Sequence, residues 1–325
     1  RFATEAFRKY GSVLIIVNTT RCAKRIYEEL NRSCEEECEL YHLSTRMCPK
    51  NRKDELKAMK QDLRDKKPVI CVSTQLIEAG VNVSFGCVIR SLAGLDSIVQ
   101  AAGRCNRHKE VKIGKVYIVK MAQDAEQLRQ LPDISRAQRA AGKVLYHFKE
   151  EPAVFAGTLD SEISVTAYYK EYFRDAGTAP TKYPVPSLGT TLDELLGRNE
   201  PGRRQYERKH GGKTGMPRMC QAFATAGKEY KVIDENAEVT VVVPYDEKAR
   251  AAIGLLEEQF ASAYDQKKAV RTLQQYSVGI SENLLKTLGR AVHKIDDAAV
   301  LVLSMDYYDK KEGVLEEPRN RFLSF

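Results

Sequence analysis

The sequence predicts an α/β protein whose parallel sheet has helices on both faces, followed by a helical connector and a smaller α+β domain. Between residues 12 and 120, short apolar runs alternate with helical patterns, as in a sheet whose strands are joined by helices. The run 13–17 is apolar without alternation, which is typical of a strand covered on both faces. Ligands of such sheets bind beyond the carboxyl ends of the strands, so we expect functional residues in the strand-to-helix loops.

The first region contains five predicted strands separated by helical patterns. The strands are SVLIIVN (12–18), ELYHLS (39–44), PVICVS (68–73), CVIRS (87–91) and KVYIVK (115–120). The helices between them are expected at 21–31, 50–63, 74–80 and 97–107. This order predicts one domain over residues 1–120.

The pattern changes beyond Met121. Helices are expected at 125–131, 134–150 and 164–175, which makes 121–189 a helical linker. The rest, 190–325, is predicted as an α+β domain with a helix at 191–199, a Gly- and Arg-rich loop at 197–218, and strands at 228–234, 239–245, 291–296 and 299–308.

Composition narrows the class of protein. The 325 residues are 43% hydrophobic and 30% charged, and no apolar run approaches the roughly 18 residues of a membrane span. We therefore expect a cytoplasmic protein that does not enter membranes. The net charge of +8 favours a polyanionic partner, and the eight cysteines suit reduced thiols better than a disulfide framework. Because the chain begins at Arg1 in a helix-like segment, we expect it to be part of a longer protein.

The segment QAAGRCNR (100–107) predicts a phosphate-binding site. Arg104 and Arg107 stand at i and i+3, so at the start of a helix both guanidinium groups would leave one face together. Guanidinium groups donate several fixed hydrogen bonds to phosphate oxygens. Gln100, one turn earlier, would help to position the same phosphates. The alternative is a solvated polar helix face.

The segment VSTQLIEAGVNVSF (72–85) precedes it. Ser73 and Thr74 fall where a predicted strand ends, and there they offer hydroxyl groups and backbone N–H groups to a phosphate of a nucleic-acid backbone. Both residues could equally cap the short helix that follows, and the two roles can coexist.

These two segments resemble motifs V and VI of superfamily 2 helicases. The resemblance implies a second RecA-like lobe in which Arg104 and Arg107 act as catalytic arginine fingers towards ATP. It places Gln75 and Glu78 at the cleft between two motor lobes and ends a helix at Gly80. The implied nucleotide-binding residues are Gln100, Glu78, Gly80 and Asn82, the last of which replaces an aspartate that is usual in the family.

Two further loops resemble nucleic-acid contacts of the same family. VNTTRCAKRIYEEL (17–30) resembles motif IV, and YHLSTRM (41–47) resembles the next strand-end loop. The implied DNA-binding residues are Asn18, Thr19, Thr20, Ser44, Thr45, Arg46, Ser73, Thr74 and Gln75. Hydroxyl groups at strand-to-helix junctions also serve as helix caps, so each loop alone has two interpretations.

Several chemical functions are excluded by what the sequence does not contain. GGKTG (211–215) lacks the first glycine of a P-loop, and no DExD-type segment follows a strand, so we expect no ATP hydrolysis by this chain alone. The five histidines are scattered and Cys34 and Cys38 have no second pair, which predicts no metal site. The basic loop 197–218 is either a phosphate-binding loop or a solvated one.

Over nearly its whole length the chain resembles the CRISPR-associated helicase-nuclease of type I systems, in its type I-C form. The resemblance rests on EAGVNVSF (78–85), AGLDSIVQAAGRCNR (93–107), YKVID (230–234) and VVVPY (241–245). It implies a first RecA-like lobe that holds ATP and Mg²⁺, an N-terminal nuclease domain, and recruitment by a Cascade-like surveillance complex. It also implies 3′ to 5′ movement on single-stranded DNA, whose path the C-terminal domain covers.

Two alternatives stay open at this point. The first is a different superfamily 2 helicase, which the core motifs permit. The second is a non-enzymatic module that binds DNA or a partner through its basic surface.

Overall fold

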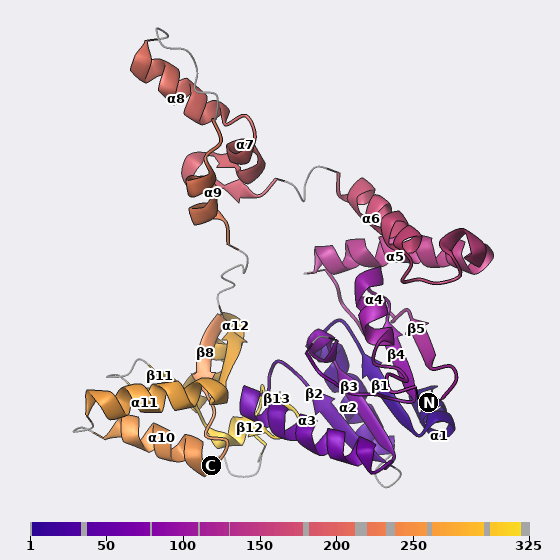
Figure 1. Cartoon of the computed structure of the whole chain (residues 1–325). Helices are drawn as coiled ribbons and strands as arrows, with labels where there is room; N and C mark the ends of the chain where they lie inside the picture. Colours follow the sequence, from indigo (N-terminus) through magenta and orange to yellow (C-terminus); the bar gives the residue numbers. More distant parts are fainter. Residues whose placement is uncertain are drawn as a thin grey trace. The chain divides into compact units, whose positions relative to one another are not determined.

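The computed structural model describes residues 2–33, 38–78, 80–109, 111–129, 131–177, 182–211, 220–231, 238–258, 262–295 and 300–319 (Figure 1). The chain forms two compact units. One comprises residues 1–165 together with 237–325, and the other comprises residues 166–236. Each unit is described by itself.

A five-stranded parallel sheet forms the centre of the first unit. Its order is β2-β3-β1-β4-β5, and its strands are β1 (Ser12–Ile16), β2 (Glu39–Leu43), β3 (Val69–Ser73), β4 (Cys87–Ser91) and β5 (Lys115–Val119). Residues of β1, β3 and β4 are almost all fully buried, as the unbroken apolar runs predict. The predicted α/β class and all five predicted strands are confirmed.

Helices cover both faces of this sheet. Alternate residues of a strand point to opposite faces, and Val13 and Ile15 pack with α1 (Phe2–Tyr10) and α2 (Thr20–Ser33). Leu14 and Ile16 pack instead with residues of α3 (Pro49–Arg64) and α4 (Leu95–Ala102). The helix α5 (Pro132–Glu150) follows β5.

A second sheet in the same unit is mixed and has the order β10-β11-β8-β9. Its strands are β8 (Glu238–Val242), β9 (Ser277–Ser281), β10 (Val292–Ile295) and β11 (Val300–Leu303), and its helices are α10 (Glu247–Glu257), α11 (Ala263–Leu273) and α12 (Glu282–Leu288). The short hairpin β12 (Tyr308–Asp309) and β13 (Gly313–Val314) follows. Apolar residues of all these elements build one core.

The second sheet packs on the parallel sheet through the start of α3. Cys48 belongs to the core of the second sheet, and its backbone N–H donates to the hydroxyl of Tyr308 at 3.1 Å. Asn51 donates to the same hydroxyl at 2.9 Å. Residues 237–325 therefore group with residues 1–165, whereas the domain boundaries expected at 120 and 189 stay predictions.

The other unit contains short elements. They are most of α6 (Glu162–Ala176), then β6 (Pro184–Val185), β7 (Thr190–Thr191), α7 (Leu192–Leu196), α8 (Glu200–His210) and α9 (Phe223–Glu229). A small core of Val185, Leu195 and Ala226 joins β6, α7 and α9.

Three sequence predictions about helices and loops are wrong. Residues 200–210 of the expected loop form α8, because the side chain of Asn199 caps the helix by accepting from the Gly202 N–H and acidic and basic residues lie at favourable ends. The described residues of the expected helix at 125–131 form turns and irregular backbone. The start of the expected strand 228–234 belongs to α9, while 232–234 and most of GGKTG lie outside the described residues.

Two further observations concern the cysteines and the lengths of the apolar helices. The seven described cysteines are free thiols. Among the described residues, no helix is both long enough and apolar enough to span a membrane.

Candidate functional site

The predicted DNA-binding residues gather at one edge of the parallel sheet. The loops that contain them follow β1, β2 and β3, which are neighbours, and parallel strands all end at the same edge. Backbone and side-chain contacts join them: the Val17 N–H donates to the carbonyl of Ser73 at 3.0 Å, and the hydroxyl of Ser73 donates to the carbonyl of Leu43 at 3.2 Å. The structure therefore assembles three separate sequence segments into one surface.

These residues differ in their exposure. Asn18, Ser44, Ser73 and Thr74 are buried, Thr19, Thr20 and Arg46 are half-buried, and Thr45 and Gln75 are exposed. The hydroxyl of Thr19 caps α2 by accepting from the Cys22 N–H at 3.2 Å, and that of Ser44 accepts from the Arg46 N–H at 3.2 Å. The cap interpretation is thus confirmed for Thr19, whereas the side chain of Thr74 makes no cap hydrogen bond.

A groove of about 750 Å³ lies at this edge. Its basic and hydroxyl-bearing lining residues are Thr20, Arg21, Lys24, Arg25, Ser44 and Arg46, and its acidic lining residues are Glu28, Asp124, Glu312, Glu316 and Glu317. Arg46 Nη2 lies 2.8 Å from Glu316 Oε1, and Lys24 Nζ lies 2.7 Å from Glu312 Oε2. The hydrogen bond from Arg46 lowers the pKa of Glu316. Two cations of the groove are therefore paired with the C-terminal segment.

His42 forms part of the wall of the same groove. Only 1% of it is exposed, its ring stacks on Tyr27, and its Nδ1 lies 2.9 Å from the carbonyl of Lys311. Since a carbonyl only accepts, Nδ1 carries the hydrogen. Nε2 has no partner among the described residues, and burial lowers the pKa of the ring.

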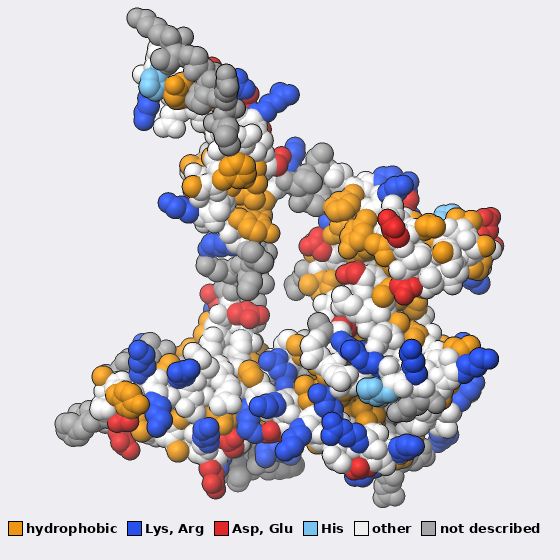
Figure 2. Space-filling model, viewed as in Figure 1, with side chains coloured by type: hydrophobic (Ala, Val, Ile, Leu, Met, Phe, Trp, Pro, Cys, Tyr) orange, Lys and Arg blue, Asp and Glu red, His pale blue; other side chains and the backbone are white. Residues whose placement is uncertain are grey.

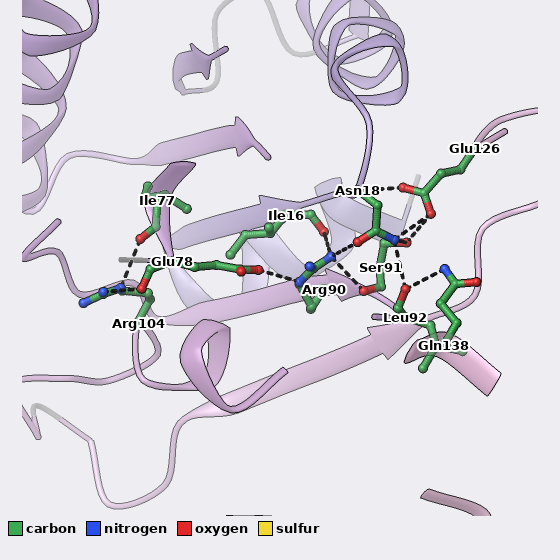
Figure 3. Close-up of polar contacts among 10 residues, drawn as sticks. All are labelled: Ile16, Asn18, Ile77, Glu78, Arg90, Ser91, Leu92, Arg104, Glu126 and Gln138. Atoms are coloured by element: carbon green, nitrogen blue, oxygen red, sulfur yellow. Dashed lines mark hydrogen bonds and ion pairs between the residues drawn. The ribbon is translucent and has the colours of Figure 1, made fainter. Parts of the chain in front are cut away.

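Arg104 is turned inwards. The helix α4 ends at Ala102, so the expectation that Arg104 and Arg107 begin a helix is wrong. Arg104 is buried, and it donates from Nε to the carbonyl of Ile77 at 3.1 Å and from Nη2 to the carbonyl of Glu78 (Figure 3). A single bridge between Phe85 and Cys105 draws the chain away from the helical path. Arg107, by contrast, is exposed.

Glu78 does not face an open cleft. Its Oε1 lies 2.8 Å from Nε of Arg90, and both side chains are buried. Burial raises the pKa of Glu78, and the guanidinium of Arg90 opposes that shift. Arg90 was missed by the sequence interpretation, although an arginine inside the apolar strand CVIRS is a signal for a buried ion pair.

Arg90 connects Glu78 with the loop after β1 (Figure 3). Its Nη1 donates to Oδ1 of Asn18 at 2.8 Å and to the carbonyl of Ser91 at 2.9 Å. Asn18 in turn donates to Oε2 of Glu126 at 2.9 Å from its side chain and to Oε1 at 2.7 Å from its backbone. A continuous series of polar contacts thus runs from Arg104 to the start of the predicted DNA-binding edge.

The remaining predicted nucleotide-binding residues are exposed. Gly80 has a φ of +70°, a conformation that favours glycine, which agrees with its expected place at the end of a helical turn. Gln100 is on the exposed side of α4. Asn82 lines a second groove of about 520 Å³, near the amino-terminal ends of the strands. Asn82 therefore lies apart from the strand-end loops, whereas Glu78 is buried within one turn of Gln75.

The fold is that of a RecA-like lobe with an attached α+β region. Residues 9–110 match a family model described as CRISPR-associated nuclease/helicase Cas3, C-terminal. The curated Cas3 of Haloferax volcanii is 63% identical over 43 residues, which is 13% of this chain and 5% of that protein. The Cas3 of Methanothermobacter thermautotrophicus is 29% identical over 99 residues, which is 30% of this chain and 11% of that protein.

A solved structure shows the same fold over almost the whole chain. The crystal structure of T. fusca Cas3 with ATP has a TM-score of 0.58 at 14% identity, covering 97% of this chain and 39% of that one. Residues 9–110 are thus similar to the C-terminal part of Cas3, the whole chain shares the fold of the solved Cas3, and the chain spans well under half of the length of these relatives. The type I-C subtype stays a prediction.

Proposed function

We propose that this chain supplies the second RecA-like lobe of a Cas3-type motor, which moves single-stranded DNA with ATP during CRISPR interference. The observation that carries the proposal is the assembly of three strand-end loops at one edge of the parallel sheet, where two of them line a groove that contains Arg21, Lys24, Arg25 and Arg46. These loops come from 18–20, 44–46 and 73–75. Backbone phosphates are the usual target of such hydroxyl, N–H and guanidinium groups.

The side chains that are open to DNA differ from those that shape the edge. Thr20, Thr45, Arg46 and Gln75 are at least partly exposed and would contact the strand. Asn18 and Ser73 are buried and hydrogen-bonded, so they would hold the loops in place. Thr74 is buried as well, and it would contribute mainly through its backbone.

We assign the polyphosphate contact to Arg107. It is exposed and has no partner among the described residues, and Gln100 is exposed near it in sequence. Arg104 uses Nε and Nη2 within the protein, which leaves its Nη1 to orient towards a phosphate. Guanidinium groups fit the charge of ATP, and arginine fingers contribute about 10³ to 10⁵ in rate. The phosphate cradle and Mg²⁺ would belong to the first lobe.

Coupling between nucleotide and DNA would pass through the buried series of polar contacts. Arg104 holds the loop of Glu78, Glu78 pairs with Arg90, and Arg90 holds Asn18 (Figure 3). A displacement of Arg104 by ATP on the first lobe would therefore reach the loop after β1. This supports a motor in which strand-end loops grip and release DNA.

The partners follow from the family. A solved structure named "CRISPR RNA-guided surveillance complex, pre-nicking" contains a chain of the same fold, with 15% identity and a TM-score of 0.54, covering 93% of this chain. We propose that the whole protein is recruited by such a complex in the cytoplasm, is a nuclease as well as a helicase, and moves 3′ to 5′. A second candidate is a non-enzymatic binding module, and the four cations of the groove alone would be sufficient for it.

The test is ATP hydrolysis stimulated by single-stranded DNA. It compares this chain alone, the N-terminal half that contains the first lobe, their mixture, and the mixture with Arg107→Ala. We expect turnover only in the mixture, and its loss by about 10³-fold or more with Arg107→Ala. Arg290→Ala is the matched control, because Arg290 is exposed and lies near the start of β10. DNA binding without turnover in any mixture would favour the binding module.

A further inference from the structure

The outer face of α3 carries a stripe of four cations. Lys53, Lys57, Lys60 and Arg64 stand at i, i+4, i+7 and i+11, so at 100° per residue they project within about 60° of one another. Three of them are exposed and Lys60 is half-buried. Figure 2 shows blue side chains gathered over this helix. We call these four residues the basic stripe.

The basic stripe is uncompensated. Like charges at i+3 and i+4 destabilise a helix, and the stripe contains three such neighbouring pairs. None of its members makes an ion pair with any described residue. An external anion that covers the stripe would offset this cost.

The acidic residues of α3 are directed elsewhere. Asp54 binds Lys50 and the hydroxyl of Tyr245, and Glu55 binds Lys311 at 2.9 Å. Asp62 binds Lys67 at 2.8 Å and Tyr41, and these contacts lower its pKa. The three carboxylates of the helix thus occupy its other faces and bind residues outside the stripe.

The basic stripe continues beyond the end of the helix. Lys66 and Lys67 follow it, and both line the 520 Å³ groove together with Lys60, Arg64 and His108. Ser12 and Pro68 in this groove begin or precede strands, so the groove lies at the amino-terminal edge of the sheet. Five-residue strands place this edge about 16 Å from the edge that carries the proposed DNA-gripping loops.

We propose that the basic stripe binds the phosphodiester backbone of a nucleic acid, at a surface separate from the strand path of the motor. Eleven residues of helix span about 16 Å, which corresponds to about five phosphates along one strand of a duplex. A protein partner fits less well, because protein interfaces are anchored by buried aromatic and apolar side chains. No large apolar side chain is exposed between residues 47 and 68, all of which are described.

The test measures binding of this chain to a labelled 30-nucleotide single strand and to a 30-base-pair duplex, without nucleotide, between 50 and 200 mM salt. The variant replaces Lys53, Lys57, Lys60 and Arg64 by Gln. We expect weaker binding, about tenfold or more at low salt, and a plot of log K against log salt less steep by about 3 to 4. The nucleic acid whose affinity for the chain falls more in the variant is the form that the basic stripe binds.

The matched control replaces the exposed Lys267, Lys268, Arg271 and Lys286 by Gln, which removes the same charge from α11 and α12. An equal loss in this control would mean that only net charge matters and would overturn the proposal. So would an unchanged salt slope in the stripe variant. Poly-L-glutamate is the third probe: if the stripe variant loses this ligand but keeps both nucleic acids, the partner is an acidic protein. Arg46→Ala tests the strand-end groove separately.

Discussion

The guanidinium of Arg90 and the carboxylate of Glu78 form an ion pair 2.8 Å apart inside the domain, with less than a tenth of either residue exposed. Removing two charges from water is costly, and the pair is tolerated because Asn18 and the Ser91 carbonyl accept from the same guanidinium. The pair lies between the loop that Arg104 holds and the loop after β1.

Replacing Arg90 by Met should destabilise the chain by about 3 to 5 kcal/mol, because Glu78 would stay buried without a cation. Urea unfolding monitored by circular dichroism measures this change. The double variant Arg90→Met, Glu78→Met should recover most of the loss, since two apolar side chains fill the space without charge. A single variant as stable as the wild type would show that the pair is not desolvated.

Releasing Arg46 from Glu316 should strengthen DNA binding at the strand-end groove. The carboxylate of Glu316 competes with a DNA phosphate for the guanidinium of Arg46, and Glu316→Gln removes this competitor. We therefore expect the affinity for a single strand to rise about two- to fivefold at low salt. Fluorescence anisotropy measures it. Glu257→Gln is the control, because it removes the same charge from the exposed pair with His293. An equal gain in both variants would indicate net charge alone.

Stability should fall in mild acid because of His42. Its folded-state pKa is lowered from 6.5 by burial, so the unfolded chain takes up the proton first as the pH falls. This contribution is fully present above pH 6.5 and is lost progressively as the pH drops from there towards the folded-state pKa. Thermal melting between pH 8 and 5 measures it.

His42→Asn is the comparison for that experiment, since it removes the titrating group. The groups that face the ring are Tyr27, the Lys311 carbonyl, Glu312 and Lys24, of which Glu312 raises the pKa and Lys24 lowers it. We expect a shallower decline of Tm below pH 6.5 in the variant. Identical pH profiles would show that His42 is protonated equally in both states.

Gly313→Ala should loosen the C-terminal segment from the groove. Gly313 has a φ of +83°, and a Cβ there would lie 2.3 Å from the carbonyl oxygen of Arg46. That carbonyl accepts from the Val314 N–H at 2.9 Å. We expect a loss of about 1 to 3 kcal/mol in urea unfolding. Gly254→Ala within α10 meets no atom and should instead stabilise by about 0.5 to 1 kcal/mol.

Local sequence patterns predicted an element correctly where the burial of a segment and its backbone geometry favour the same element. The five predicted strands are correct to within two residues, because a short run rich in β-branched residues such as 13–17 favours a strand that is covered on both faces. The strand-end loops followed from this, since parallel strands end together. The prediction of a loop over 197–218 was wrong because it gave more weight to the glycines and arginines of the segment than to its helix signals. Those signals are the N-cap Asn199, the acidic Glu200 in the first turn and the basic last turn.

The candidate site likewise has some features that the sequence predicted and others that only the fold decides. Residue type and spacing identified Arg104 and Arg107 as a pair, but only the fold turned Arg104 onto the carbonyls of Ile77 and Glu78. Likewise, no pattern shows that Arg90 would meet Glu78, twelve residues earlier in the chain, or that Glu316 would reach Arg46, because such contacts depend on how separate segments pack.

The sequence alone therefore determined the order along the chain of the five strands of the parallel sheet, the motifs and the residue types at the sheet edge, because these depend on local burial and periodicity. The tertiary structure decided which of those side chains are open and which are bound, and it placed the C-terminal segment against the groove. Those outcomes depend on contacts between residues distant in the chain, whose desolvation and hydrogen bonding no local pattern encodes.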